Sequence, residues 1–119
     1  PGFPMDEAAI RDVAGRAWDR GYDPGGIARQ IAAVQASGER TEALRALRVP
    51  ALVIHGESDP LIRVEGGRAT AAAIEGAELV TIAGMGHDLP RGVWTQIADA
   101  IANLVARAER ERVAAGAVG

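Results

Sequence analysis

The chain has 119 residues, of which 48% are hydrophobic and 24% charged, and its formal net charge at pH 7 is -3. This composition is typical of one folded globular domain and excludes an extensively disordered chain. The small negative charge offers no basic surface, so we predict no nucleic-acid and no membrane partner. The absence of cysteine excludes disulfides and thiolate metal sites and is consistent with a cytoplasmic protein, which we predict.

Three helices are expected in the first part of the chain. Apolar residues recur at helical spacing over residues 6–19, and Gly21 ends that segment. A second helix is predicted to begin at Asp23-Pro24, with the aspartate as the cap, and to close at Ser37. A short third helix is expected over residues 41–47. The first residues of the chain lack the basic segment and apolar core of a signal peptide.

Two short strands and two further helices are expected after Pro50. Residues 51–54 and 78–82 form apolar runs bounded by glycine and proline, and the first run lacks polar alternation, which predicts a strand buried on both faces. A helix is expected over residues 65–74 and a long amphipathic helix over residues 93–108. The charged cluster at residues 107–112 predicts a solvated helix end. The longest strongly apolar run is far too short to span a bilayer.

The loops that leave the two strands carry the candidate catalytic residues. Two buried strands joined by a crossover helix should be parallel, and ligands of such sheets lie beyond the carboxyl ends of the strands. Asp59 follows Ile54 by five residues and His87 follows Ile82 by five residues. Neighbouring strands lie about 4.8 Å apart, so the carboxylate and the imidazole are expected to meet. A carboxylate that accepts from one ring nitrogen leaves the other nitrogen free to take a proton from a hydroxyl nucleophile.

Two stretches of the sequence resemble a known fold family. Residues 49–62, with His55-Gly56-Glu57-Ser58-Asp59-Pro60, resemble the seventh strand and acid loop of the α/β-hydrolase fold. Residues 79–89, with Gly84-Met85-Gly86-His87, resemble the eighth strand and histidine loop, and the order of aspartate before histidine suits the family. The resemblance implies an α/β fold, a partial α/β-hydrolase sheet of two parallel strands with a crossover helix and a C-terminal helix, preceded by cap-like helices.

The resemblance also implies roles and boundaries. Asp59 would be the acid and His87 the general base of a Ser-Asp-His triad in a hydrolase acting on a small ester-like substrate, with no cofactor. We predict a helical cap-like segment at 1–47, a C-terminal α/β-hydrolase segment at 48–108 and a frayed tail at 109–119. Residues 20–30 are similar to cap helices of small ester hydrolases, including aclacinomycin methylesterase-like enzymes, and Trp18 and Tyr22 are candidates for substrate binding.

The nucleophile of the family is missing from the sequence. Its motif is G-x-S-x-G between a strand and a helix, whereas the two serines here are Ser37, with no strand before it, and Ser58, inside the acid loop. We therefore expect the chain to be a C-terminal fragment that is inactive alone and associates with itself or with a missing N-terminal portion. The alternative is a non-catalytic α/β module that binds a small molecule or a protein.

Two other side chains near the loops have less specific interpretations. His55, at the end of the first strand, is expected to form local hydrogen bonds. Asp88, beside His87, could pair with Asp59 around a metal ion, but one histidine and two carboxylates lack the regular spacing of helical ligands, and we predict no metal.

Overall fold

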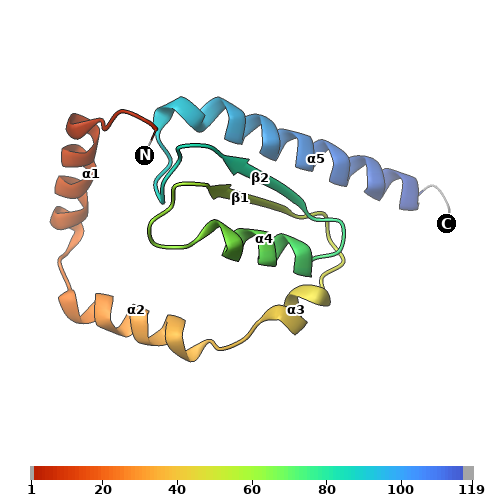
Figure 1. The fold of residues 1–119 in the computed structure, drawn as a ribbon, viewed down its shortest axis with the longest axis horizontal. Helices are drawn as coiled ribbons and strands as arrows, with labels where there is room; N and C mark the ends of the chain where they lie inside the picture. The colour runs from red at the N-terminus through yellow and green to blue at the C-terminus, as the bar shows by residue number, and fades with distance from the viewer. Residues whose placement is uncertain (1, 117–119) are drawn as a thin grey trace. The chain divides into compact units, whose positions relative to one another are not determined.

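The computed structural model describes residues 2–116, which divide into two compact units. Residues 4–40 form a helical unit, and residues 2–3 together with residues 41–116 form an α/β unit (Figure 1). None of the helices in the described part of the chain combines the length and the apolar character that a membrane span requires.

The helical unit contains two helices with local sequence signals at their ends. Helix α1 spans Glu7–Arg20 and helix α2 spans Pro24–Ala36. The Asp6 carboxylate accepts a hydrogen bond of 2.9 Å from the Ala9 amide, which caps α1, and Pro24 occupies the first turn of α2. No residue of either helix is buried, so the apolar stripes of both helices remain exposed in this unit.

The α/β unit is built around two parallel strands. Its elements are α3 (Thr41–Arg45), β1 (Leu52–Gly56), α4 (Val64–Ala73), β2 (Glu78–Ile82), the 3-10 turn η1 (Arg91–Val93) and α5 (Trp94–Gly116). Strand β1 pairs with β2 in parallel, with Leu52 opposite Glu78 and Gly56 opposite Ile82. The predicted partial sheet with its crossover helix and terminal helix is therefore confirmed.

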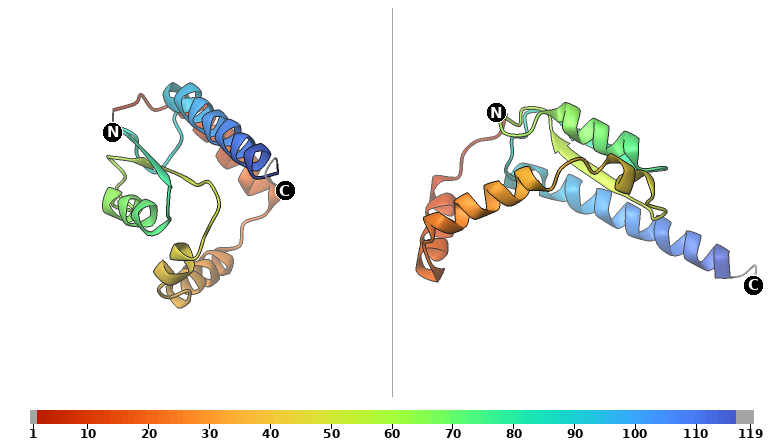
Figure 2. Two further views of the ribbon diagram at one scale, coloured as in Figure 1. Left: turned by 90° about the vertical axis from the view of Figure 1, so that its right-hand side faces the viewer. Right: turned by 90° about the horizontal axis from the view of Figure 1, so that it is seen from below.

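The strands lie between two helices. Figures 1 and 2 show α4 on one face of the strands and α5 on the other. On the α5 side a small apolar core forms around the buried side chains of Ile82, Met85 and Val93, which are packed against Phe3, Ile54, Val80 and Ile97.

The strands are less buried than the sequence predicted. In β1 only Gly56 is fully buried, and the other residues are half-buried. The expectation of a strand buried on both faces is confirmed in part: helices contact β1 on both faces, but most of its residues stay half-buried because the described sheet has two strands and leaves one edge of each unpaired. The lack of polar alternation in β1 reflects contact with α4 and α5 on its two faces rather than complete enclosure.

Helix α5 is longer than predicted. It continues without a break from Trp94 to Gly116, eight residues beyond Ala108. Residues 107–112, whose charges suggested a solvated end, are Arg, Glu and Ala, which all have high helix propensity and favour continuation of the helix. The last three residues of the predicted tail, 117–119, lie outside the described residues.

Candidate active site

The acid loop follows β1 and holds the Asp59 carboxylate by backbone amides. One carboxylate oxygen, Oδ1, accepts hydrogen bonds from the Leu61 amide at 2.8 Å and from the Ile62 amide at 3.0 Å. Pro60 intervenes and has no amide hydrogen to donate, so the loop presents its next two amides to the carboxylate. Both amides of the loop therefore donate to Oδ1, and Oδ2 remains available to accept a hydrogen bond from another residue.

The histidine loop approaches the acid loop without intervening side chains. An ideal Cβ at Gly56 would lie 2.3 Å from the Met85 carbonyl oxygen and 2.4 Å from the Gly86 carbonyl oxygen. Only glycine allows this approach. Gly84 turns the chain before the histidine with a φ of 72°, a conformation that glycine adopts without strain.

The two loops are joined by backbone hydrogen bonds that extend the strand pairing. The Glu57 amide donates to the Ile82 carbonyl at 3.1 Å, and the Ser58 amide donates to the Met85 carbonyl at 3.0 Å. The loops therefore leave the sheet together, at the carboxyl ends of both strands.

Asp59 and His87 meet at this edge of the sheet. His87 Nδ1 lies 2.8 Å from Asp59 Oδ2, as the parallel arrangement of the strands led us to expect. The aspartate side chain is 5% exposed, whereas the histidine side chain is 56% exposed. With the carboxylate ionised, Nδ1 must carry the proton, and Nε2 of the neutral ring is then an acceptor.

The environment keeps Asp59 ionised. Burial of the carboxyl raises its pKa, but hydrogen bonds from the Ile62 amide, from His87 and from the Leu61 amide outweigh that effect, and the pKa falls from 3.8 to about 2. At neutral pH the carboxylate is therefore charged and able to accept from the imidazole.

This lowered pKa predicts how stability depends on pH. The ionised carboxylate stabilises the folded state above about pH 4, and the contribution is lost as the pH falls through about 2. The difference in free energy of unfolding between the wild-type chain and Asp59→Asn should therefore shrink from pH 5 to pH 2. Urea titrations at several pH values measure it, with Asp88→Asn as a control for the change in net charge. A difference that stays constant over this range would contradict the prediction.

Trp94, the first residue of α5, contacts the C-terminal part of the histidine loop. Its indole Nε1 donates to the Leu89 carbonyl at 2.8 Å, and the Arg91 guanidinium lies 5.4 Å from the ring centre. The sequence does not predict these contacts, because the capping of a loop by an indole leaves no periodic pattern.

Replacement of Trp94 by phenylalanine should lower the free energy of unfolding by about 1 kcal/mol, the net contribution of one hydrogen bond. Urea denaturation measures the change. The matched control is Trp18→Phe, at an exposed position in α1, which should change stability by less than about 0.5 kcal/mol. If both substitutions changed the free energy of unfolding equally, the hydrogen bond of the Trp94 indole would make no specific contribution to stability.

The other candidate residues make contacts of their own. His55 Nδ1 lies 2.9 Å from the Gly56 carbonyl, and its ring lies against Gly67 of α4, which agrees with a local role. Trp18 and Tyr22 stack on each other in the helical unit with ring centres 4.8 Å apart, and both are largely exposed. Their role in substrate binding stays a prediction.

Neither serine of the sequence occupies a nucleophile position. The Ser37 hydroxyl donates to the Ala33 and Val34 carbonyls at the end of α2, and Ser58 lies in the acid loop. Within residues 2–116, no three His, Asp or Glu side chains gather closely enough to hold a metal ion.

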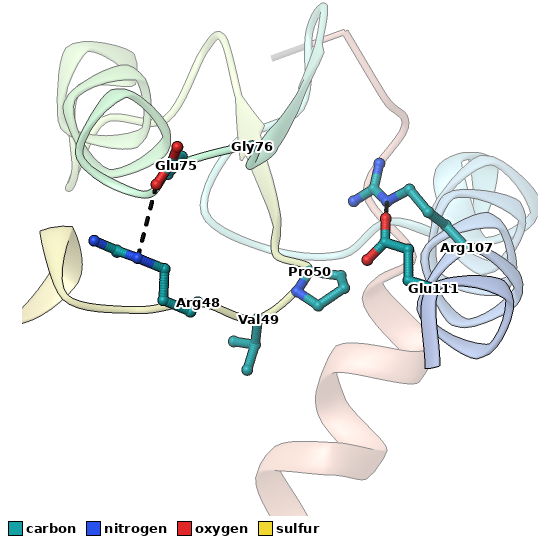
Figure 3. A pocket seen from close by; sticks show the side chains of 7 residues that line it. All are labelled: Arg48, Val49, Pro50, Glu75, Gly76, Arg107 and Glu111. Carbon is teal, nitrogen blue, oxygen red and sulfur yellow. Dashed lines mark ion pairs between the residues drawn. The ribbon is translucent and has the colours of Figure 1, made fainter. Parts of the chain in front are cut away.

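An open pocket of about 360 Å³ lies at the opposite edge of the sheet, where the strands begin. Figure 3 shows its polar walls, with Arg48 facing Glu75 at 3.7 Å and Arg107 facing Glu111 at 3.9 Å. Arg107 also pairs with Glu78 at the start of β2, and its side chain is only 25% exposed. The prediction of a solvated helix end is therefore wrong at this position, and the charges of the pocket neutralise each other.

These observations define the class of the protein and then its family. The parallel strand pair, with its crossover helix and long terminal helix, is a partial α/β-hydrolase fold. The chain belongs to the α/β-hydrolase family described as TAP-like protein, which matches residues 14–114.

A curated relative supports the same relationship over a shorter stretch. The bifunctional esterase/perhydrolase DCH of Acinetobacter calcoaceticus is 35% identical to this chain over 51 residues. These residues are 42% of this chain and 18% of that protein, so the match covers less than a fifth of the relative's length.

Proposed function

We propose that this chain supplies the acid and the general base of a serine-type α/β-hydrolase that cleaves an ester or a related acyl bond. The observation that carries the proposal is the 2.8 Å contact between His87 Nδ1 and Asp59 Oδ2 at the carboxyl edge of the sheet. Membership of the α/β-hydrolase family and the similarity to a protein named as an esterase support an acyl substrate.

The proposed chemistry follows from the two ring nitrogens. Asp59 holds the proton on His87 Nδ1, so Nε2 takes the proton of a hydroxyl nucleophile as that hydroxyl attacks the acyl carbon. The charged carboxylate then stabilises the imidazolium. The imidazolium returns its proton to the departing alcohol, and a second cycle with water releases the acid. The 56% exposure of the His87 side chain leaves room for these partners.

The nucleophile and the oxyanion-binding amides belong, in this proposal, to a longer polypeptide that includes this chain. The sequence contains neither G-x-S-x-G nor cysteine, and loss of the nucleophile removes most of the rate acceleration of such enzymes. We accordingly expect the 119-residue chain to be inactive alone and the longer protein to act on a small ester-like molecule.

The test compares two preparations. The chain as given and the longer product of its coding region are assayed with an aryl ester such as p-nitrophenyl acetate, each as wild type and as His87→Ala. The proposal expects turnover only in the longer product and its loss in the variant. Turnover by the longer product that survives His87→Ala would overturn the assignment of the base.

The absence of a nucleophile also favours a second candidate, a non-catalytic module that binds a small molecule or a protein. The two candidates differ in a single measurement. A longer product that carries no serine reactive towards a fluorophosphonate, and that turns over no aryl ester, would favour the module.

The unpaired outer edges of β1 and β2 support a proposal about partners. An open strand edge is a template for pairing with another chain, so we expect self-association or association with the rest of the longer protein. Light scattering across a concentration series tests self-association. A monomer at high concentration, folded as judged by circular dichroism, would contradict it.

A further inference from the structure

A hydrogen bond between two side chains joins the acid loop to the sheet. The Thr81 hydroxyl, on β2, donates to Glu57 Oε1 at 2.8 Å across 24 residues of sequence. Thr81 is opposite His55 in the strand register, so its backbone is fixed by the paired part of the sheet. Glu57 lies beyond the end of β1, in the loop that leads to Asp59.

Two further hydrogen bonds of this segment, from Glu57 and Ser58, are made by the backbone. The amides of Glu57 and Ser58 donate to carbonyls of Ile82 and Met85, and residues of any type except proline can make such bonds. The bond to Thr81 instead requires an acceptor side chain at position 57 and a hydroxyl at position 81. It is thus a contact by which a side chain of the segment before Asp59 is joined to the neighbouring strand.

The backbone of Asp59 forms a weak hydrogen bond with the residues that precede it. Its own amide donates to the Gly56 carbonyl at 3.4 Å, which is long for such a bond. Glu57 and Ser58 form the turn that directly precedes Asp59, so a movement of Glu57 shifts the backbone that carries the Asp59 carboxylate. The 2.8 Å contact with His87 weakens steeply when its partners move apart or turn.

We propose that Glu57 is a positioning residue, whose bond to Thr81 holds the acid loop so that Asp59 faces His87 Nδ1. The inference rests on the proposed function, in which Asp59 fixes the tautomer of His87. Glu57 acts through Asp59 and transfers no proton itself. A merely structural role would lower stability when the bond is lost but would leave the tautomer of His87 unchanged.

The test reads the tautomer of His87 by ¹⁵N NMR on the 119-residue chain labelled at histidine. The chain has two histidines, so a His55→Gln variant assigns both sets of signals. In the wild type we expect the neutral His87 ring to carry its proton on Nδ1. In Glu57→Ala the ratio of the Nδ1–H to the Nε2–H form should fall about tenfold, the change expected when a charged hydrogen bond is lost.

Matched variants separate positioning from general damage. Glu57→Gln keeps an oxygen acceptor and Thr81→Ser keeps the hydroxyl, so both should retain the wild-type ratio. Thr81→Val removes the hydroxyl from the other side of the bond and should reproduce the effect of Glu57→Ala, and the double variant should add nothing further. Thr81→Val also keeps the test decisive if Glu57→Ala does not fold.

The outcomes distinguish the two proposals. A wild-type ratio that favours Nδ1–H, together with an unchanged ratio in a folded Glu57→Ala or Thr81→Val variant, would overturn the positioning role and leave the proposed function intact. A wild-type ring that favours Nε2–H would overturn the proposed pairing of Asp59 with His87, and the positioning role with it.

Discussion

Replacement of Gly56 by alanine is expected to lower the free energy of unfolding by about 3 kcal/mol, at the upper end of the usual cost of overpacking. The added methyl group would lie 2.3 Å and 2.4 Å from the carbonyl oxygens of Met85 and Gly86. Both obstacles are backbone atoms, which cannot rotate away as a flexible side chain can. The histidine loop must therefore move, and the contact between Asp59 and His87 should be lost as well.

Urea denaturation measures the change in stability, and the ¹⁵N tautomer ratio of His87 reports the lost contact. The matched control is Gly66→Ala in α4, where the new methyl group meets only the Ile62 side chain at 3.5 Å. Because alanine is the better helix former, the control should be neutral or stabilising by up to about 1 kcal/mol. A Gly56→Ala chain as stable as the control would show that the two loops do not approach as described.

Replacement of Asp59 by asparagine in the longer protein should reduce kcat/KM about 10⁴-fold, the loss seen when the acid of such a triad is neutralised. The asparagine amide can donate to His87 Nδ1, which would place the ring proton on Nε2. A ring with its proton on Nε2 cannot accept one from the nucleophile. The effect should fall on the chemical step, because the substituted side chain is isosteric and only 5% exposed in the native chain.

The control for this experiment is Asp88→Asn. It removes the neighbouring carboxylate, which is exposed, and should change kcat/KM less than about twofold. Similar losses in both variants would indicate that net charge near His87, rather than the contact with Asp59, supports turnover.

The elements around the candidate site were predictable from local patterns. Two apolar runs bounded by glycine and proline, with a helix-length segment between them, restrict the topology to a parallel pair with a crossover helix. Once the strands are parallel, residues in the loops that follow them must share one edge. The positions of Asp59 and His87 were therefore predictable without knowledge of any side-chain contact.

Contacts between distant side chains were not predictable in this way. The pairs Glu57 with Thr81 and Arg107 with Glu78 join residues that are 24 and 29 positions apart, and no periodic pattern marks them. The degree of strand burial was misjudged because an apolar sequence shows that a strand can be buried, but does not show how many strands lie beside it. The extent of α5 was misjudged because a dense mixture of charges suggested fraying, although Ala, Glu and Arg all favour a helix.

The backbone bonds from Glu57 to Ile82 and from Ser58 to Met85 make the lengths of the two loops interdependent. One residue inserted into either loop would shift these bonds out of step and rotate Asp59 and His87 away from each other. The turn at Gly76 lies at the other end of the strands, where the Glu78 amide donates to the Ala51 carbonyl at 2.9 Å. A change of chain length at that turn would displace the start of β2, whereas a change in either loop would act directly on the contact between Asp59 and His87.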